Sequence, residues 1–283
     1  MSPPQPKLLV ASSKAELPSV LCNEIVARAS AAIDERNSFS IALSGGSLPK
    51  FLAKLPESFE EQKIDPRWDS WHVFLADERC VPSDHEDSNL KAIKGHFLDA
   101  PGVGVPAAQI YGIDDALVAK LGDETGDDAD ATTEVIAVGY EGAMRAVLPS
   151  ESSLDLAVLG FGPDGHTCSL FPDHPLLGLE SDRWVASIVD SPKPPPRRIT
   201  LTMRFLNELT RDIIVCGAGA SKQPIIDKVF VLGEEDYSKA EDGTCRTVLP
   251  TLASPPPYPC SMVTPSASLT WVVDHDAMVG DRN

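Results

Sequence analysis

The chain of 283 residues carries 42 acidic side chains against 24 Lys and Arg, which gives a formal net charge of −18. Hydrophobic residues make up 42% and charged residues 23% of the chain, proportions typical of a globular protein. A negative field of this size disfavours nucleic acid and anionic membranes, because both are bound mainly through basic patches. No apolar run is long enough to cross a bilayer, so we expect neither kind of partner.

The N-terminal residues and the cysteines predict a location in the cytoplasm. Residues 1–17 combine neither a basic stretch nor a long apolar stretch, as a secretory signal would. The six cysteines form no CxxC pair, and most lie in apolar stretches where a free thiol behaves as a small hydrophobic side chain. We therefore expect reduced thiols and no structural zinc site.

Taken in chain order, the sequence alternates between helical and strand-like segments. Residues 15–33 carry apolar side chains at helical spacing, with Glu24 and Arg28 placed for an i,i+4 ion pair. Four short apolar runs are predicted strands, each ending in polar or glycine-rich residues: 38–43, 71–76, 154–160 and 211–217. This alternation predicts an α/β fold with a mainly parallel sheet and helices on both faces. Without internal repeats or composition shifts, we expect a single domain over residues 1–283.

Three further segments are predicted to lie outside the sheet. Residues 114–134 are acidic and weakly apolar, which predicts a surface loop or a partly mobile insertion before a helix at 135–148. The proline-rich stretches 191–198 and 253–261 are read as ordered, stiff connections rather than as ligands of polyproline-binding domains, because strands flank them.

The loop Ser44-Gly45-Gly46-Ser47 follows the first of these strands. In open α/β sheets ligands bind at the carboxyl ends of the strands, where the loops converge. Glycines allow backbone N–H groups to approach an anion closely, and the next helix would add the positive end of its dipole. The loop therefore predicts a phosphate site; the alternative is an ordinary tight turn.

Two more loops supply cations near strand ends. In Asp77-Glu78-Arg79, the arginine could bind phosphate oxygens through its planar guanidinium, or could brace the loop by pairing with a neighbouring carboxylate. The second group lies in the stiff loop 191–198 and contains three cations: Lys193, Arg197 and Arg198. These cations either contribute to an anion site or face solvent and serve solubility.

The stretch "GFGPDGHTCSLFP" at residues 160–172 places a single histidine after a predicted strand. His166 follows Gly162 and Asp164, and a carboxylate two residues away can fix the tautomer of an imidazole and raise its basicity. We expect Thr167 and Ser169 to cap a helix that begins at "TCSLF". His166 is then a candidate general base; the alternative is a hydrogen-bonded structural histidine.

Two other chemistries in this stretch are less favoured. Cys168 could act as a nucleophile with His166, but residues two apart on a helix point to different faces, so we expect it to pack in the core. A metal site would need ligands at a recognised spacing. No such spacing connects the four candidates, Asp164, His166, Asp173 and His174. We therefore predict no metal.

Four stretches together resemble the 6-phosphogluconolactonases: "LSGGSLPKFL", "FLADERCVPSDHEDSN", "LDLAVLGFGPDGHTCSLFPDHPLL" and "SPKPPPRRITLT". They occur in the order found in that family, and the resemblance covers nearly the whole chain, most weakly at 114–134. It implies hydrolysis of 6-phospho-D-glucono-1,5-lactone to 6-phospho-D-gluconate, a step of the oxidative pentose phosphate pathway. It also implies a Rossmann-like (NagB/RpiA-like) fold, shared with glucosamine-6-phosphate isomerases, and no obligatory cofactor.

The resemblance assigns roles to residues of this chain. His166 corresponds to the family's proposed base, with Asp164 beside it, and Arg79 is expected both to bind phosphate and to assist catalysis. For phosphate binding, the resemblance points to Gly45, Gly46, Ser47, Arg79 and Lys193. Together with the residues singled out from the loops themselves, the expected binding set comprises Ser44, Gly45, Gly46, Ser47, Asp77, Arg79, Gly162, Lys193 and Arg197. Arg79, Lys193 or loop N–H groups are the candidates for stabilising the oxyanion.

Two alternative functions stay open at this point. One is a glucosamine-6-phosphate isomerase/deaminase, although that group typically continues after "DGH" with a run like I-A-F-N-E-P, where this chain has "TCSLFP". The other is a non-catalytic sugar-phosphate sensor, which would be accompanied by a helix-turn-helix and a basic patch, and the sequence gives no sign of either. The lactonase is therefore favoured, with a sugar-phosphate lactone as its partner and a monomer or weak homo-oligomer as its state.

Overall fold

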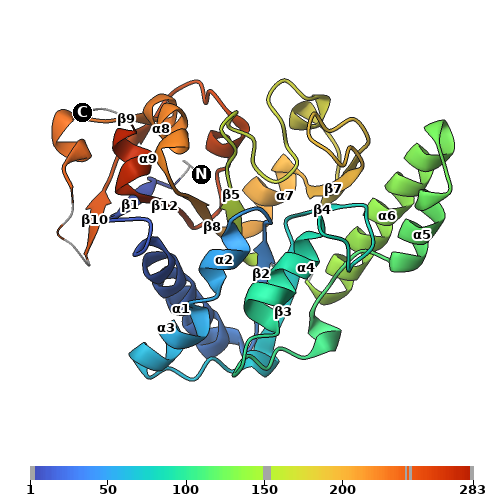
Figure 1. The fold of residues 1–283 in the computed structure, drawn as a ribbon, viewed down its shortest axis with the longest axis horizontal. Coiled ribbons are helices and arrows are strands. Elements are labelled where there is room, and N and C mark those ends of the chain that lie inside the picture. Colours follow the sequence, from blue (N-terminus) through green and yellow to red (C-terminus); the bar gives the residue numbers. More distant parts are fainter. Residues whose placement is uncertain (1–3, 149–153, 240, 242–243, 281–283) are drawn as a thin grey trace.

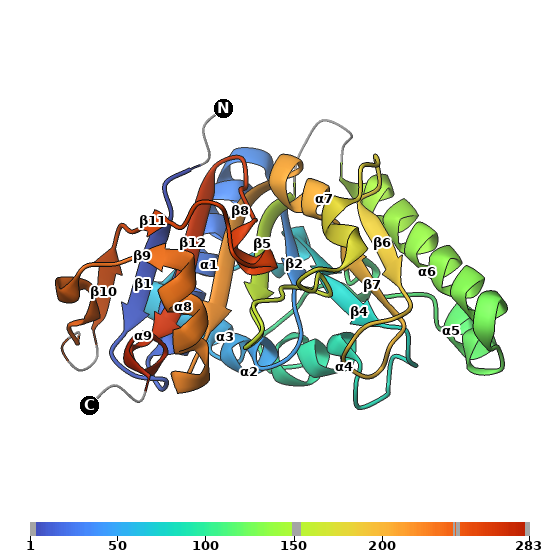
Figure 2. The same cartoon turned by 90° about the horizontal axis from the view of Figure 1, so that it is seen from above.

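The computed structural model describes residues 4–148, 154–239, 241 and 244–280. Within these residues the main sheet has seven strands in the order β10-β1-β12-β8-β5-β2-β3 (Figures 1 and 2). Its strands are β1 (Lys7–Ala11), β2 (Phe39–Leu43), β3 (Trp71–Leu75), β5 (Leu154–Gly160), β8 (Thr210–Gly217), β10 (Cys245–Val248) and β12 (Ser268–Asp274). Every neighbouring pair is parallel except β10 with β1.

The strands of the main sheet are buried apolar runs, as expected for parallel strands covered on both faces. All five residues of β2 are buried, and Ile41 is paired with Leu156 of β5. The four strands predicted from the sequence are confirmed, and β1 and β12 extend the sheet beyond β8. The predicted fold class, a mainly parallel α/β sheet, is therefore confirmed.

Two small antiparallel sheets accompany the main one. The three-stranded sheet has the order β4-β7-β6, from β4 (Asp77–Arg79), β6 (Val185–Ile188) and β7 (Arg198–Leu201). The prediction that Asp77-Glu78-Arg79 forms a loop is therefore wrong: its backbone pairs with β7, with Glu78 opposite Ile199. A two-stranded sheet joins β9 (Phe230–Val231) to β11 (Thr251–Leu252).

Helices lie on both faces of the main sheet, as Figure 1 shows, with α1 on one side and α8 and α9 on the other. Their bounds are α1 (Leu17–Arg36), α2 (Leu48–Leu52), α3 (Leu55–Gln62), α4 (Asn89–Ile93), α5 (Asp115–Gly122), α6 (Gly126–Val147), α7 (Met203–Glu208), α8 (Gln223–Val229) and α9 (His275–Val279). The predicted first helix is confirmed, and Arg28 bonds to Glu24 at 2.7 Å. Among the described residues, no helix combines the length and the apolar character of a membrane span.

The prediction of a loop at 114–134 is wrong, because this segment forms α5 and the first half of α6. The carboxylate of Asp114 accepts the backbone N–H of Ala116 at 2.8 Å and so caps α5. The buried face of α6 begins with small side chains, Ala129 and Thr133, and the helix packs against α5 and the three-stranded sheet. Small and acidic residues are compatible with a helix, but they leave only a weak apolar pattern in the sequence.

A buried carboxylate connects α6 to the three-stranded sheet. Glu141 accepts hydrogen bonds from the backbone N–H groups of Trp184 at 3.0 Å and Val185 at 3.1 Å. Its oxygens also accept bonds from Arg183 and Arg145, each at 2.9 Å. Because a buried acceptor of several bonds is costly to remove, this carboxylate should hold α6 in place.

We predict that Glu141→Gln lowers the free energy of unfolding by about 2 kcal/mol. The glutamine amide has no negative charge, and its NH₂ group would face the N–H donors that the carboxylate now accepts. Urea unfolding at pH 7 measures this loss. Glu57→Gln is the matched control, since Glu57 is largely exposed and pairs with Lys54 at the surface. Equal stabilities of the two variants would contradict the assignment.

Candidate active site

A cavity lies at the carboxyl ends of four neighbouring strands, β8, β5, β2 and β3. After β2 the chain continues to β3 on one side, whereas after β5 it continues to β8 on the other side. The boundary between β2 and β5 is therefore the point at which the strand order reverses, where open α/β sheets form a ligand crevice. The topology thus places the cavity at the expected binding position of the fold.

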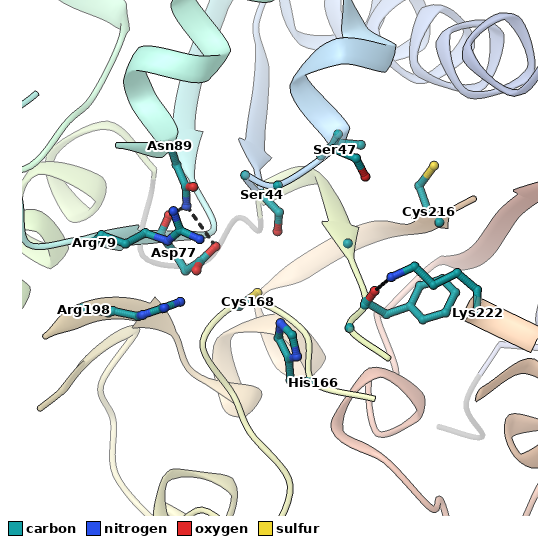
Figure 3. Close-up of a pocket in the computed structure, with 17 residues that line it drawn as sticks. Ser44, Ser47, Asp77, Arg79, Asn89, His166, Cys168, Arg198, Cys216 and Lys222 are labelled. Atoms are coloured by element: carbon teal, nitrogen blue, oxygen red, sulfur yellow. Dashed lines mark hydrogen bonds between the residues drawn. The ribbon is translucent and has the colours of Figure 1, made fainter. Parts of the chain in front are cut away.

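Each of these four strands delivers polar residues to the cavity. In Figure 3, Arg79, which follows β3, lies on one side, and Lys222, which follows β8, lies on the other. Ser44, after β2, and His166, after β5, lie between them. The order of the residues across the cavity therefore repeats the order of the strands in the sheet.

The loop Ser44–Ser47, which the sequence predicts as a phosphate site, forms one wall of the cavity. A Cβ atom on Gly45 would lie 1.7 Å from the amide oxygen of Asn89, so only glycine fits there. Gly46 has a φ of +69°, a left-handed conformation that glycine adopts without strain. The loop is thus built around glycine, although the helix after it, α2, is only five residues long.

The side chain of Arg79 points into the cavity, where its positive charge is available to a ligand. Its Nη1 donates to the carbonyl of Asp87 at 2.7 Å, and within the described residues it forms no ion pair. The carboxylate of Glu78 is bound at the start of α4 instead, where it accepts the backbone N–H groups of Asn89 at 2.8 Å and Leu90 at 2.9 Å. Burial raises the pKa of Glu78 to about 7, despite these bonds. The alternative in which a neighbouring carboxylate neutralises Arg79 therefore finds no support.

The two arginines of the proline-rich loop point in different directions, as neighbouring residues at a strand do. Arg197 bonds to Asp130 of α6 at 2.7 Å and does not line the cavity, which contradicts its predicted place in the binding set. Arg198 lines the cavity instead. Burial lowers the pKa of Arg198, and the charge of Arg79 lowers it further. Two close guanidinium groups therefore face this side of the cavity (Figure 3).

His166 lies in a loop and not at the start of a helix, so the predicted caps by Thr167 and Ser169 are wrong. The backbone pairs Thr167 with Leu170 in a tight turn. The hydroxyl of Thr167 donates to the carbonyl of Gly160 at 2.9 Å, and that of Ser169 donates to Asp77 at 2.8 Å. Both hydroxyls thus hold the loop against its neighbours rather than capping a helix.

The imidazole of His166 is held by a carboxylate and an ammonium. Its Nδ1 contacts Oδ1 of Asp164, and Nζ of Lys193 lies 3.0 Å from the same nitrogen. Lys193 also lies 3.0 Å from Oδ2 of Asp164. A Cβ atom on Gly162 would come within 2.1 Å of the ring, so glycine at this position makes room for the histidine.

The charges of this group follow from burial and pairing. Burial lowers the pKa of His166, and Asp164 opposes that shift only in part. Burial alone would raise the pKa of Asp164, but the bonds from His166 and Lys193 lower it to about 2. Near neutral pH the site therefore holds a neutral imidazole beside an ionised carboxylate, the state in which a histidine can accept a proton.

The less favoured chemistries find no support in this geometry. Burial raises the pKa of the Cys168 thiol, and the side chain is buried, which agrees with a packing role. In the part of the chain that the structure describes, no three His, Cys, Asp or Glu side chains are grouped as metal ligands.

Besides Arg198, two polar residues of the cavity were absent from the predicted binding set, Lys222 and Asn89. Lys222 donates to the carbonyl of Phe161 and lies over its ring, 4.9 Å from the centroid. The sequence did contain a signal for Lys222, because it is a cation shortly after the end of a predicted strand. The same criterion singled out Arg79. Asn89 lines the cavity and donates to the carbonyl of Asp77 at 2.8 Å. Asn89 had no comparable signal, since it enters the cavity only through the packing of α4.

Comparisons with known proteins show the family to which this chain is related. The family model described as glucosamine-6-phosphate isomerases/6-phosphogluconolactonase matches residues 12–271. The chain belongs to this family. Within the family, a curated relative named probable 6-phosphogluconolactonase 3, chloroplastic, from Oryza sativa subsp. indica is 43% identical over 199 residues. That match covers 70% of this chain and 58% of the relative, less than two thirds of its length.

Other members of the family match over a larger part of their length. Probable 6-phosphogluconolactonase 1 from Arabidopsis thaliana is 36% identical over 268 residues, covering 93% of this chain and 88% of the relative. The solved structure of 6-phosphogluconolactonase from Trypanosoma cruzi has a TM-score of 0.74 and 25% identity. It covers 98% of this chain and 97% of its own. The family and the Rossmann-like fold implied by the sequence are therefore both confirmed.

We predict that Asp164→Asn lowers the pKa of His166 further, because the carboxylate is the group that raises it against the effect of burial. NMR titration of the histidine ring resonances measures this directly. Asp182→Asn serves as the control, since the side chain of Asp182 is fully exposed. An unchanged or raised pKa in Asp164→Asn would show that the two side chains are not coupled.

Proposed function

We propose that this chain hydrolyses 6-phospho-D-glucono-1,5-lactone to 6-phospho-D-gluconate, as a step of the oxidative pentose phosphate pathway. One observation carries the proposal: a neutral His166 backed by ionised Asp164 shares a cavity with the cations Arg79, Arg198 and Lys222. A base and an anion site within one cavity match an ester that bears a phosphate. The names of the curated relatives support the same reaction.

The phosphate is proposed to bind between the Ser44–Ser47 loop and the cations of the cavity. The chain has a net charge of −18, so an anionic substrate needs a locally positive site. Arg79 and Arg198 provide adjacent guanidinium groups, which match phosphate oxygens in geometry and charge. An anion placed between them would also relieve their mutual repulsion.

The proposed reaction uses His166 twice. Neutral His166 takes a proton from a water molecule while the water oxygen attacks C1 of the lactone. The C1 carbonyl becomes a tetrahedral oxyanion, which Lys222, Arg79 or loop N–H groups would stabilise. When the bond from C1 to the ring oxygen breaks, the imidazolium returns its proton to that oxygen. The products are a carboxylic acid, which ionises, and the free hydroxyl of 6-phosphogluconate.

The role of Asp164 in this scheme is to orient and stabilise the imidazole. Oδ1 of Asp164 contacts Nδ1 of His166 and would hold the ring proton on that nitrogen. The lone pair on Nε2 is then available to accept a proton from the water. The ionised carboxylate also stabilises the imidazolium that forms after proton transfer. No step of this scheme uses a metal or a cofactor, in keeping with the absence of an obligatory cofactor implied by the family resemblance.

The cellular setting stays a prediction. We propose a cytoplasmic protein that acts on a small sugar phosphate and works as a monomer or a weak homo-oligomer, without nucleic acid as a partner. Several curated relatives carry the word chloroplastic in their names, whereas probable 6-phosphogluconolactonase 1 from Arabidopsis thaliana does not.

We predict turnover of freshly generated 6-phosphogluconolactone well above the spontaneous rate, unchanged by a chelator. In His166→Asn, kcat should fall roughly a hundredfold or more, because the general base is lost, with little change in affinity. Formation of 6-phosphogluconate, followed by a dehydrogenase-coupled assay, measures both. Ammonia release from glucosamine 6-phosphate would instead indicate the deaminase, and lactone binding without turnover would indicate a sensor.

We predict that Arg79→Ala raises KM for the lactone by roughly tenfold or more, with a smaller effect on kcat, because it removes a charge-assisted bond to the phosphate. Arg197→Ala is the matched control, since Arg197 pairs with Asp130 outside the cavity and should leave KM near that of the wild type. A KM raised by Arg197→Ala but not by Arg79→Ala would reverse the assignment.

A further inference from the structure

The loop that carries Lys193 is poor in backbone donors. Residues 191–198 include Pro192 and the run Pro194–Pro196, and proline has no backbone N–H group. The carbonyl groups that this loop turns toward the protein must therefore accept hydrogen bonds from outside the loop's own backbone. Arg198, the first residue of β7, supplies the bonds to three of them.

The guanidinium of Arg198 donates to the carbonyls of three consecutive residues. Its Nε donates to Pro195 at 2.9 Å, and its Nη2 donates to Lys193 at 2.8 Å and to Pro194 at 3.1 Å. Arg198 is 3% exposed, so these carbonyl groups replace the water that would otherwise solvate the charge. The planar guanidinium has donors in several fixed directions, whereas a lysine ammonium is a single point that cannot reach all three carbonyls.

Ser191 holds the same backbone from the other end of the loop. Its hydroxyl donates to the Lys193 carbonyl at 2.9 Å, and the backbone N–H of Lys193 donates to that hydroxyl at 3.2 Å. The backbone N–H of Ser191 donates to the carbonyl of Pro196 at 3.2 Å. The peptide groups on both sides of Lys193 are therefore fixed by Ser191 and Arg198 together.

A fixed backbone gives the ammonium of Lys193 a defined place beside the cavity. Nζ of Lys193 lies 3.0 Å from Oδ2 of Asp164 and 3.0 Å from Nδ1 of His166, which lines the cavity. The ring centroid of Phe171 lies 5.8 Å from Nζ of Lys193 and 5.9 Å from Cζ of Arg198, so both cations face one apolar surface. The loop thus brings Lys193 to the group of residues that includes the candidate base.

We propose that Arg198 is a positioning residue: by holding the carbonyls of Lys193, Pro194 and Pro195 around its guanidinium, it fixes Lys193 where the ammonium can bind the phosphate of the substrate. This inference rests on the proposed function and adds a second role for Arg198 to it. Nε and Nη2 hold the loop, while Nη1, 3.4 Å from the hydroxyl of Ser169, stays on the side of the cavity (Figure 3).

The test is a double-mutant cycle of the wild type, Arg198→Lys, Lys193→Met and the double variant. Arg198→Lys keeps a positive charge at the cavity but cannot donate to three carbonyls. With Lys193 present, we expect it to raise KM for the lactone and Kd for 6-phosphogluconate roughly tenfold, with kcat within about threefold of the wild type. In the Lys193→Met background the same substitution should raise both constants less than about twofold, because the residue through which Arg198 acts is gone.

Arg197→Lys is the matched control, since the neighbouring arginine pairs with Asp130 outside the cavity and should leave both constants near those of the wild type. An equal effect of Arg198→Lys in the two backgrounds would overturn the proposal and show that Arg198 acts on the ligand directly. Unchanged constants in Arg198→Lys would overturn it as well. If that variant does not fold, Ser191→Ala takes its place in the cycle, with an expected rise of about threefold that depends on Lys193. An effect of Ser191→Ala that did not depend on Lys193, or no effect, would contradict the proposal.

A measurement without ligand separates this inference from the proposed function. The backbone N–H of Lys193 reports the state of the loop, because the three residues that follow have no N–H group. Its hydrogen exchange should be roughly tenfold or more faster in Arg198→Lys than in the wild type or in Arg197→Lys. If the chain hydrolysed no lactone but this exchange were accelerated, the proposed function would fail and Arg198 would still position Lys193. Unchanged exchange would refute the positioning role whatever the enzyme assay shows.

Discussion

The parallel alignment of β8, β5, β2 and β3 is the constraint on which the site depends. Parallel strands end at the same edge of a sheet, so the segments that follow them meet at that edge. The chain leaves β2 and β5 in opposite directions, which opens a crevice between their loops. Residues separated by more than a hundred positions in the sequence, such as Ser44 and Lys222, thereby line one cavity.

Within this crevice, close packing decides which residues fit. Gly45 makes room for the amide of Asn89, and Gly162 makes room for the ring of His166. The proline-rich stretch 253–261 reaches the same loop, since the backbone N–H of Cys260 donates to the carbonyl of Gly165 at 3.0 Å. The position of the imidazole is therefore set by contacts from several elements and not by its own loop alone.

The electrostatics of the site divide into two functions. On one side, the guanidinium groups of Arg79 and Arg198 lie close together, and we propose that they bind the anionic end of a substrate in a protein whose overall charge is negative. At the centre, the carboxylate of Asp164 and the ammonium of Lys193 act on the imidazole with opposite effects on its pKa. Catalysis of the proposed kind needs both functions, because binding of the phosphate positions the lactone and the neutral histidine supplies the base.

The sequence by itself determined the α/β class, four of the sheet's strands, the glycine loop and the histidine, because these depend on local patterns along the chain. Tertiary structure decided the rest. The acidic segment 114–134 became helical through packing that its few apolar residues did not reveal, and Asp77–Arg79 became a strand through pairing with β7. The tertiary structure also decides that Arg197 pairs with Asp130 and that Arg198 and Lys222 line the cavity. The direction of a long side chain depends on neighbours that are distant in sequence. The local spacing of residues along the chain contains no information about those neighbours.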